Sequence, residues 1–69
     1  MILVTVHCID NSEGTFNGAY GMHFYNLNEA QTFAREESNA LGSYNNTQSW
    51  TRVYYDGVLL SEYVGGSPI

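Results

Sequence analysis

Four stretches of the chain have the residue types of β-strands: residues 2–9, 19–25, 49–55 and 58–63. In the first three, more apolar and more polar residues alternate with the two-residue period of a strand. In the first stretch the more apolar face carries Ile2, Val4, Val6 and Cys8, and in the second it carries Tyr20, Met22 and Phe24. If these two faces turn inward, His7 and His23 both point outward.

The last two stretches flank Asp56-Gly57, a dipeptide that favours the tight hairpin turns with positive backbone φ angles. A regular hairpin around this turn divides residues 49–63 between two faces. One face would carry Trp50, Arg52, Tyr54, Leu59 and Tyr63. The other would carry Thr51, Val53, Tyr55, Val58, Leu60 and Glu62.

Residues 26–42, NLNEAQTFAREESNALG, have the spacing of an amphipathic helix. We expect Asn28 to cap the helix, with Gln31 as its capping-box partner, and Gly42 to end it. The expected buried stripe consists of Ala30, Phe33, Ala34, Ala40 and Leu41. Glu37 falls near the centre of this stripe, so it needs either a position at the rim of the sheet or a donor such as Arg52 or a histidine.

This order of elements predicts one α+β domain over residues 1–69, with a mainly antiparallel four-stranded sheet (β-β-α-β-β) and one helix on one face. The expected core is Val4, Val6, Met22, Phe24, Ala30, Phe33, Ala34, Val53 and Leu60. Residues 10–18 and 43–48 are expected to form polar, turn-rich loops. The C-terminal GGSPI has little to hold it and is expected to fray.

The charge balance restricts the partners of the chain. Seven acidic residues stand against two arginines, there is no lysine, and the formal net charge is −5. Direct binding to nucleic acid or to anionic membranes requires several basic side chains on one surface, so we expect neither. A basic protein, such as one that binds nucleic acid, would instead be attracted.

Cysteine content and hydropathy indicate a cytoplasmic protein. Cys8 is the only cysteine, so the chain forms no internal disulfide, which fits a reducing compartment. Residues 1–10, MILVTVHCID, lack the features of a signal peptide, and the chain has no apolar run long enough to span a membrane.

No residue pattern specifies catalysis, so we expect no enzymatic activity, no metal and no cofactor. His7 and Cys8 are adjacent on a strand and therefore point to opposite faces, which prevents a nucleophile–base pair. His7 and His23 supply two metal ligands without an evident third. The glycines follow no phosphate-binding pattern, and no pair of carboxylates has a spacing that indicates acid–base chemistry.

A single helix covers one face of a sheet, so the other face is left open. Tryptophan, tyrosine and arginine, which dominate binding hot spots, are among its expected occupants. We therefore expect this face to bind another protein or a second copy of the chain. The candidate partner-binding residues are His7, Tyr25, Trp50, Arg52, Tyr54, Leu59 and Tyr63.

Residues 27–63, a helix leading into a glycine-turned hairpin, resemble in layout the small phage-encoded inhibitors of the anti-CRISPR type. The resemblance implies a non-enzymatic inhibitor that occupies a nucleic-acid-binding defence complex in the cytoplasm of a bacterial host. Those inhibitors share no motif, so no binding residue is carried over from them. A homodimeric structural or assembly protein and an accessory subunit of a bacterial enzyme are the alternatives.

Overall fold

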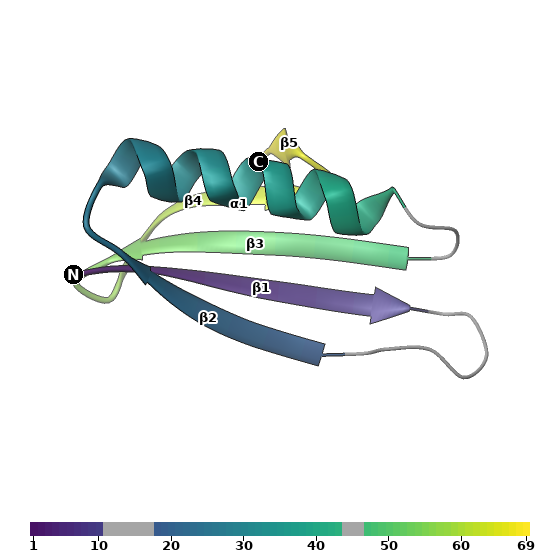
Figure 1. Ribbon diagram of the computed structural model, residues 1–69, viewed down its shortest axis with the longest axis horizontal. Coiled ribbons are helices and arrows are strands. Elements are labelled where there is room, and N and C mark those ends of the chain that lie inside the picture. The colour runs from purple at the N-terminus through teal and green to yellow at the C-terminus, as the bar shows by residue number, and fades with distance from the viewer. Residues whose placement is uncertain (11–17, 44–46) are drawn as a thin grey trace.

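The computed structural model describes residues 1–10, 18–43 and 47–69 (Figure 1). Its elements, in chain order, are β1 (Ile2–Asp10), β2 (Gly18–Phe24), α1 (Leu27–Gly42), β3 (Thr47–Tyr55), β4 (Val58–Val64) and β5 (Ser67–Pro68). The α+β class is confirmed, and the sheet has five strands rather than four. Most of the two expected polar loops, residues 11–17 and 44–46, lies outside the described residues.

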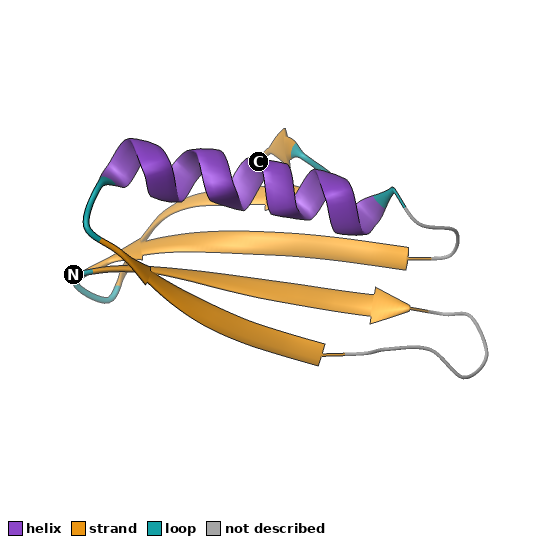
Figure 2. Cartoon of the chain, in the orientation of Figure 1, coloured by secondary structure: helices purple, strands orange, loops and turns teal. Residues whose placement is uncertain are grey.

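The sheet is antiparallel throughout, with the strand order β2-β1-β3-β4-β5. The chain leaves the edge strand β2, runs through α1, and returns in β3, which pairs with β1 along the whole length of both strands. Figure 2 shows α1 lying along one side of this sheet. The helix packs mainly on β3 and β1, next on β4, and only slightly on β2.

The hydrophobic core lies between α1 and the central strands. Val4, Val6 and Val53 are fully or almost fully buried in the sheet, and Ala30 and Ala34 are fully buried on the helix. These small helical residues allow α1 to lie close to the strands. The predicted inward face of β1 is confirmed, including buried Cys8, which is a free thiol.

Four other members of the predicted core are less buried. Phe24 and Phe33 pack against each other at the margin of the core, with ring centroids 5.2 Å apart. Met22 and Leu60 were expected to be buried, but they are 42% and 48% exposed. Met22 lies on edge strand β2, which α1 scarcely covers, and Leu60 lies in an irregular part of β4.

The helix begins two residues earlier than expected. Asn26, not Asn28, is the N-cap, and its side-chain oxygen accepts a hydrogen bond from the backbone N–H of Glu29 at 3.1 Å. The last helical residue is Gly42, as predicted, but the following Ser43 keeps a right-handed conformation (φ −81°). The C-terminal cap is therefore not the left-handed type that glycine favours.

The buried stripe of α1 also differs from the expectation at its second half. Ala40 is exposed, whereas Ser38 is fully buried. The Ser38 hydroxyl donates to the carbonyl of Arg35 and accepts a hydrogen bond from the backbone N–H of Gly66. This serine therefore ties the helix to the C-terminal segment.

Glu37 is half-buried and has a partner that the sequence did not indicate. That partner is the Tyr20 hydroxyl on β2, whose pKa responds to the Glu37 carboxylate. Burial of the hydroxyl, together with the charge and hydrogen bond of Glu37, raises the pKa of Tyr20. The donor is thus neither Arg52 nor a histidine, and the pair links α1 to the edge strand.

The hairpin of β3 and β4 has the predicted turn but not the predicted register. Asp56 and Gly57 both have positive φ angles, 47° and 84°, as a type I′ turn requires. Beyond the turn, Tyr54 pairs with Leu59 and Val53 pairs with Ser61. Leu60 is therefore the extra residue of a β-bulge.

The bulge shifts the alternation of all later residues of β4. Tyr63 now pairs with buried Thr51 and packs against the core, while Glu62 pairs with Arg52 on the other side. The prediction that Trp50 and Tyr63 share a face is therefore wrong, as is the placement of Glu62 on the helix side. One additional residue exchanged the faces of the two side chains.

The C-terminal segment is held in place, contrary to the expectation that it frays. Gly65 and Gly66 turn with positive φ angles, and Ser67–Pro68 form β5 against β4. The backbone N–H of Gly65 donates to the carbonyl of Ser49, and that of Ile69 donates to the carbonyl of Glu62. These bonds, with the bond to Ser38, anchor the segment to β3, β4 and α1.

Candidate protein-binding surface

The side of the sheet opposite α1 carries the alternate residues of each strand, and no element of the described chain lies over it. We call it the open face. Its register places side chains from four strands in rows across the sheet. Its members include Leu3, Thr5, His7, His23, Trp50, Arg52, Tyr54, Leu59, Glu62 and Val64.

His7 and Trp50 form an aromatic stack at one end of the open face. They are direct cross-strand partners on β1 and β3, and their rings are nearly parallel, with centroids 5.2 Å apart and an interplanar angle of 5°. Both side chains are half-buried. Val64, the partner of Trp50 on β4, extends this apolar row and is 46% exposed.

An ion pair occupies the middle of the open face. The Arg52 Nε donates to a Glu62 carboxylate oxygen at 2.5 Å, and the two side chains are 39% and 25% exposed. The hydrogen bond that Arg52 donates to Glu62 raises the pKa of Arg52, and Tyr54 contributes in the same direction. The pair fixes the guanidinium against the sheet and leaves this row without net charge.

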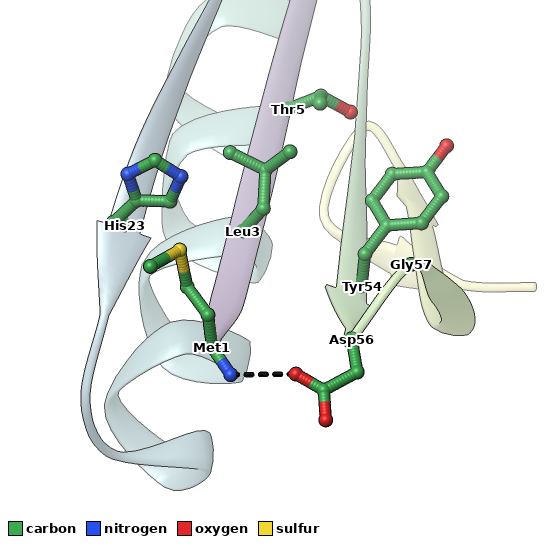
Figure 3. Close-up of a pocket in the computed structure, with 7 residues that line it drawn as sticks. All are labelled: Met1, Leu3, Thr5, His23, Tyr54, Asp56 and Gly57. Atoms are coloured by element: carbon green, nitrogen blue, oxygen red, sulfur yellow. Dashed lines mark hydrogen bonds and ion pairs between the residues drawn. The ribbon is translucent and has the colours of Figure 1, made fainter.

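An open hollow of about 540 Å³ lies at the other end of the open face, next to the Asp56-Gly57 turn. Figure 3 shows Leu3 at its centre, with His23 on one side and Tyr54 on the other. The two rings come from β2 and β3, the strands that flank β1, and both residues pair with Leu3. At the rim, the amino group of Met1 lies 2.8 Å from the Asp56 carboxylate.

The Thr5 hydroxyl lies between the hollow and the ion pair. Its oxygen is buried and has no hydrogen-bond partner among the described residues. Thr5 stands between Gly21 on β2 and Arg52 on β3, so its neighbours across the sheet are a residue without a side chain and a paired guanidinium.

Five of the seven predicted binding residues lie together on the open face: His7, Trp50, Arg52, Tyr54 and Leu59. Tyr63 lies on the opposite face because of the bulge. Tyr25 lies beyond the end of β2, where it is fully exposed in the connection to α1.

The structure adds Leu3, Thr5, His23, Glu62 and Val64 to the candidate surface. The alternation of β1 and β2 already placed Leu3 and His23 on the outward side, and their pairing with each other and with Tyr54 adds the hollow. Glu62 and Val64 could not be assigned without the bulge. The predicted position of Glu62 depended on a regular hairpin, and Val64 lies beyond residues 49–63, whose faces were predicted.

The described residues show no geometry for a metal centre. Within residues 1–10, 18–43 and 47–69, no three histidine, cysteine or acidic side chains are grouped so that they could hold an ion. His7 pairs with Ala19 and His23 pairs with Leu3, so the histidines lie toward opposite ends of the β1–β2 pair.

Comparisons with protein-family models, with curated protein sequences and with solved structures found no match to this chain. In the described part of the chain, no helix has the length and apolar character needed to cross a bilayer.

Proposed function

We propose that this chain is a non-catalytic protein-binding domain that docks, through its open face, on a basic surface of a protein partner. The observation that carries the proposal is the set of aromatic and aliphatic side chains on a side of the sheet that no described element covers. Trp50, Tyr54 and Leu59 stand on paired strands there, together with His7. Aromatic and aliphatic side chains gathered on one face of a small domain are typical of contact sites.

The local geometry of the open face favours tight association. The His7–Trp50 stack and the Arg52–Glu62 pair hold four large side chains in defined positions before any partner arrives. Side chains that are already ordered lose less conformational entropy on binding. The hollow beside Leu3 provides a place for an apolar side chain of the partner, which would pack between His23 and Tyr54.

The charge of the chain favours a basic partner. The net charge is −5, and one of the two arginines is already paired with Glu62. Asp56 stands at the rim of the hollow, paired with the amino group of Met1, and Glu29 and Glu36 are exposed on α1, on the other side of the sheet. Such a field accelerates association with a positively charged surface and makes the association rate fall as salt is added.

Basic protein surfaces commonly serve to bind nucleic acid, so the specific form of the proposal is a stoichiometric inhibitor. Together with the layout of residues 27–63, this favours a phage-encoded inhibitor that occupies a nucleic-acid-binding defence complex of the CRISPR type. The domain would compete with the nucleic acid for the complex and would not modify it chemically. An accessory subunit would bind its enzyme without displacing nucleic acid.

The test compares two neighbouring tyrosines. Tyr54 lies on the open face, whereas Tyr55 is 49% exposed on the helix side and serves as the matched control. Tyr54→Ala and Trp50→Ala should weaken binding to a purified CRISPR-type complex by about 2 kcal/mol or more, and Tyr55→Ala by less than about 0.5 kcal/mol. The measurements are titration of each folded variant and competition with the complex's own nucleic acid.

Equal affinity of Tyr54→Ala and Tyr55→Ala for the complex would refute the open face as the binding site. Binding that leaves the nucleic acid in place would refute the inhibitor and favour the accessory subunit. If the complex does not bind and wild type forms a dimer that Tyr54→Ala dissociates, the open face serves self-association instead.

A further inference from the structure

The two edges of the sheet differ in how well they are protected from pairing with another strand. On one edge, β5 has only two residues, one of which is Pro68, which has no backbone N–H to donate. On the other edge, β2 presents seven residues, Gly18–Phe24, without proline and without an aspartate, glutamate, lysine or arginine. Short strands, prolines and charged side chains are the usual means of protecting an edge, and β2 has none of them.

The outer edge of β2 is accessible along the described chain. No described strand pairs with it, and alternate residues of an antiparallel edge strand direct their N–H and C=O groups away from their neighbour. Tyr20 and Met22, on the helix side of β2, are 44% and 42% exposed because α1 packs over the more central strands. A second strand could therefore approach without meeting the helix.

We propose that β2 pairs antiparallel with β2 of a second copy of this chain, around a two-fold axis at Gly21. In that register, Tyr20 of each copy lies opposite Met22 of the other, and Ala19 lies opposite His23. The two half-exposed apolar side chains of each strand cover those of the partner. An aromatic ring against a thioether is a favourable cross-strand pair.

Charge and symmetry favour β2 of a second copy of this chain, rather than a strand of a different protein, as the partner of β2. A chain with a net charge of −5 repels its copies, but the seven residues of β2 place no carboxylate at this contact. On the helix side, the Glu37 carboxylate already interacts with the Tyr20 hydroxyl. Because Gly21 is the middle residue of β2, the antiparallel register pairs the full length of both strands.

The consequence for the molecule is a continuous sheet with two open faces on the same side. Each open face is centred on β1 and β3 and is not covered by the pairing of β2. The dimer would therefore present two copies of the candidate binding surface to one partner or to two. Contacts of one strand pair are small compared with standard interfaces, so the dimer should dissociate on dilution.

The test uses two substitutions that change the net charge equally. Met22→Glu places a carboxylate in the proposed contact, and Leu60→Glu places one on β4 at a similar exposure, 48% against 42%. Mass should be measured by sedimentation equilibrium over a dilution series of wild type and both variants. We expect the wild-type mass to rise from 7.7 kDa toward twice that value with concentration.

Met22→Glu should weaken the dimer by about tenfold or more, and Leu60→Glu by less than about threefold. Amide hydrogen exchange in β2 should slow as the wild-type concentration rises. A wild type that stays at 7.7 kDa up to millimolar concentration overturns the proposal. Equal weakening by both variants, or a dimer lost in Tyr54→Ala but kept in Met22→Glu, also overturns it.

Discussion

Replacing Val53 by alanine tests the position of the core directly. Val53 is fully buried on β3, pairs with Val4 on β1, and belongs to the cluster that includes Ala30 and Ala34. The substitution removes two methyl groups, worth about 0.8 kcal/mol each by transfer. The cavity adds to this cost because neighbouring strands are held by their hydrogen bonds and α1 already lies close, so we expect a total of about 2–3 kcal/mol.

That loss is a large fraction of the stability of a small domain. At about 0.05–0.15 kcal/mol per residue, 69 residues correspond to about 3–10 kcal/mol. Urea unfolding followed by circular dichroism should therefore show a clear fall in the midpoint of Val53→Ala with an unchanged slope.

The matched control removes the same atoms from an exposed position. Val58 follows the Asp56-Gly57 turn and is 62% exposed, so Val58→Ala should change the unfolding free energy by less than about 0.5 kcal/mol. If Val53→Ala is no more destabilising than Val58→Ala, the helix does not cover this face of β3. The assignment of the open face would then fail with it.

Three further predictions concern the helix start, the C-terminal turn and alkaline stability. Asn26→Ala should destabilise the fold by about 1 kcal/mol in urea unfolding, and Asn28→Ala by almost nothing, because Asn26 is the N-cap. A larger loss of stability in Asn28→Ala than in Asn26→Ala would place the cap at Asn28. Gly66→Ala should lower the thermal midpoint more than Gly57→Ala does. Both positions have φ near +85°, which costs alanine about 1–2 kcal/mol, but only at Gly66 would the new Cβ lie 2.6 Å from a side-chain carbon of α1. Equal effects would mean that the C-terminal turn does not pack on the helix. Burial and the Glu37 carboxylate on α1 raise the pKa of Tyr20 above 10.0 in the folded state. The stability that the protonated Tyr20 hydroxyl contributes is therefore complete below pH 10.0 and is lost as the pH rises through the folded-state pKa. Tyr20→Phe should therefore lose less stability than wild type in alkaline urea titrations, and an identical pH profile would contradict the pair.

The parts of the fold that follow from local pattern could be predicted from the sequence. One face of the first strand, with Ile2, Val4, Val6 and Cys8, is more apolar than the other and was therefore expected to be buried. The structure confirms that these four side chains are buried. The Asp56-Gly57 turn was also predictable, because few dipeptides accept two positive φ angles. These features place five of the seven candidate residues correctly on the open face.

The bulge at Leu60 could not be predicted because Val58-Leu59-Leu60 is apolar throughout and gives no two-residue period to locate an extra residue. Any register of this run buries a similar side chain. The packing of Tyr63 on the core and the pairing of Glu62 with Arg52 distinguish the registers, and both are tertiary contacts.

The helix cap and the C-terminal strand were missed for similar reasons. Asn26 and Asn28 each stand three residues before a residue of the capping-box type, Glu29 and Gln31, so the sequence offers two equivalent starts. In the structure Asn26 is the cap, and its side chain accepts the hydrogen bond of the Glu29 N–H. The C-terminal segment is ordered by Ser38, which lies 28 positions earlier in the chain.

The pairing of β1 with β3 has a consequence for how the chain acquires its structure during synthesis. The two central strands come from opposite ends of the sequence, and Met1 contacts Asp56 across a separation of 55 residues. A nascent chain can close the local pair of β1 and β2 early, but one edge of β1 stays unsatisfied until β3 leaves the ribosome. Topologies dominated by such distant pairs fold slowly, and here the half-finished sheet exposes Val4 and Val6 beside an open edge. The delay between the emergence of β1 and the emergence of β3 thus sets how long that intermediate is exposed to aggregation or to chaperones.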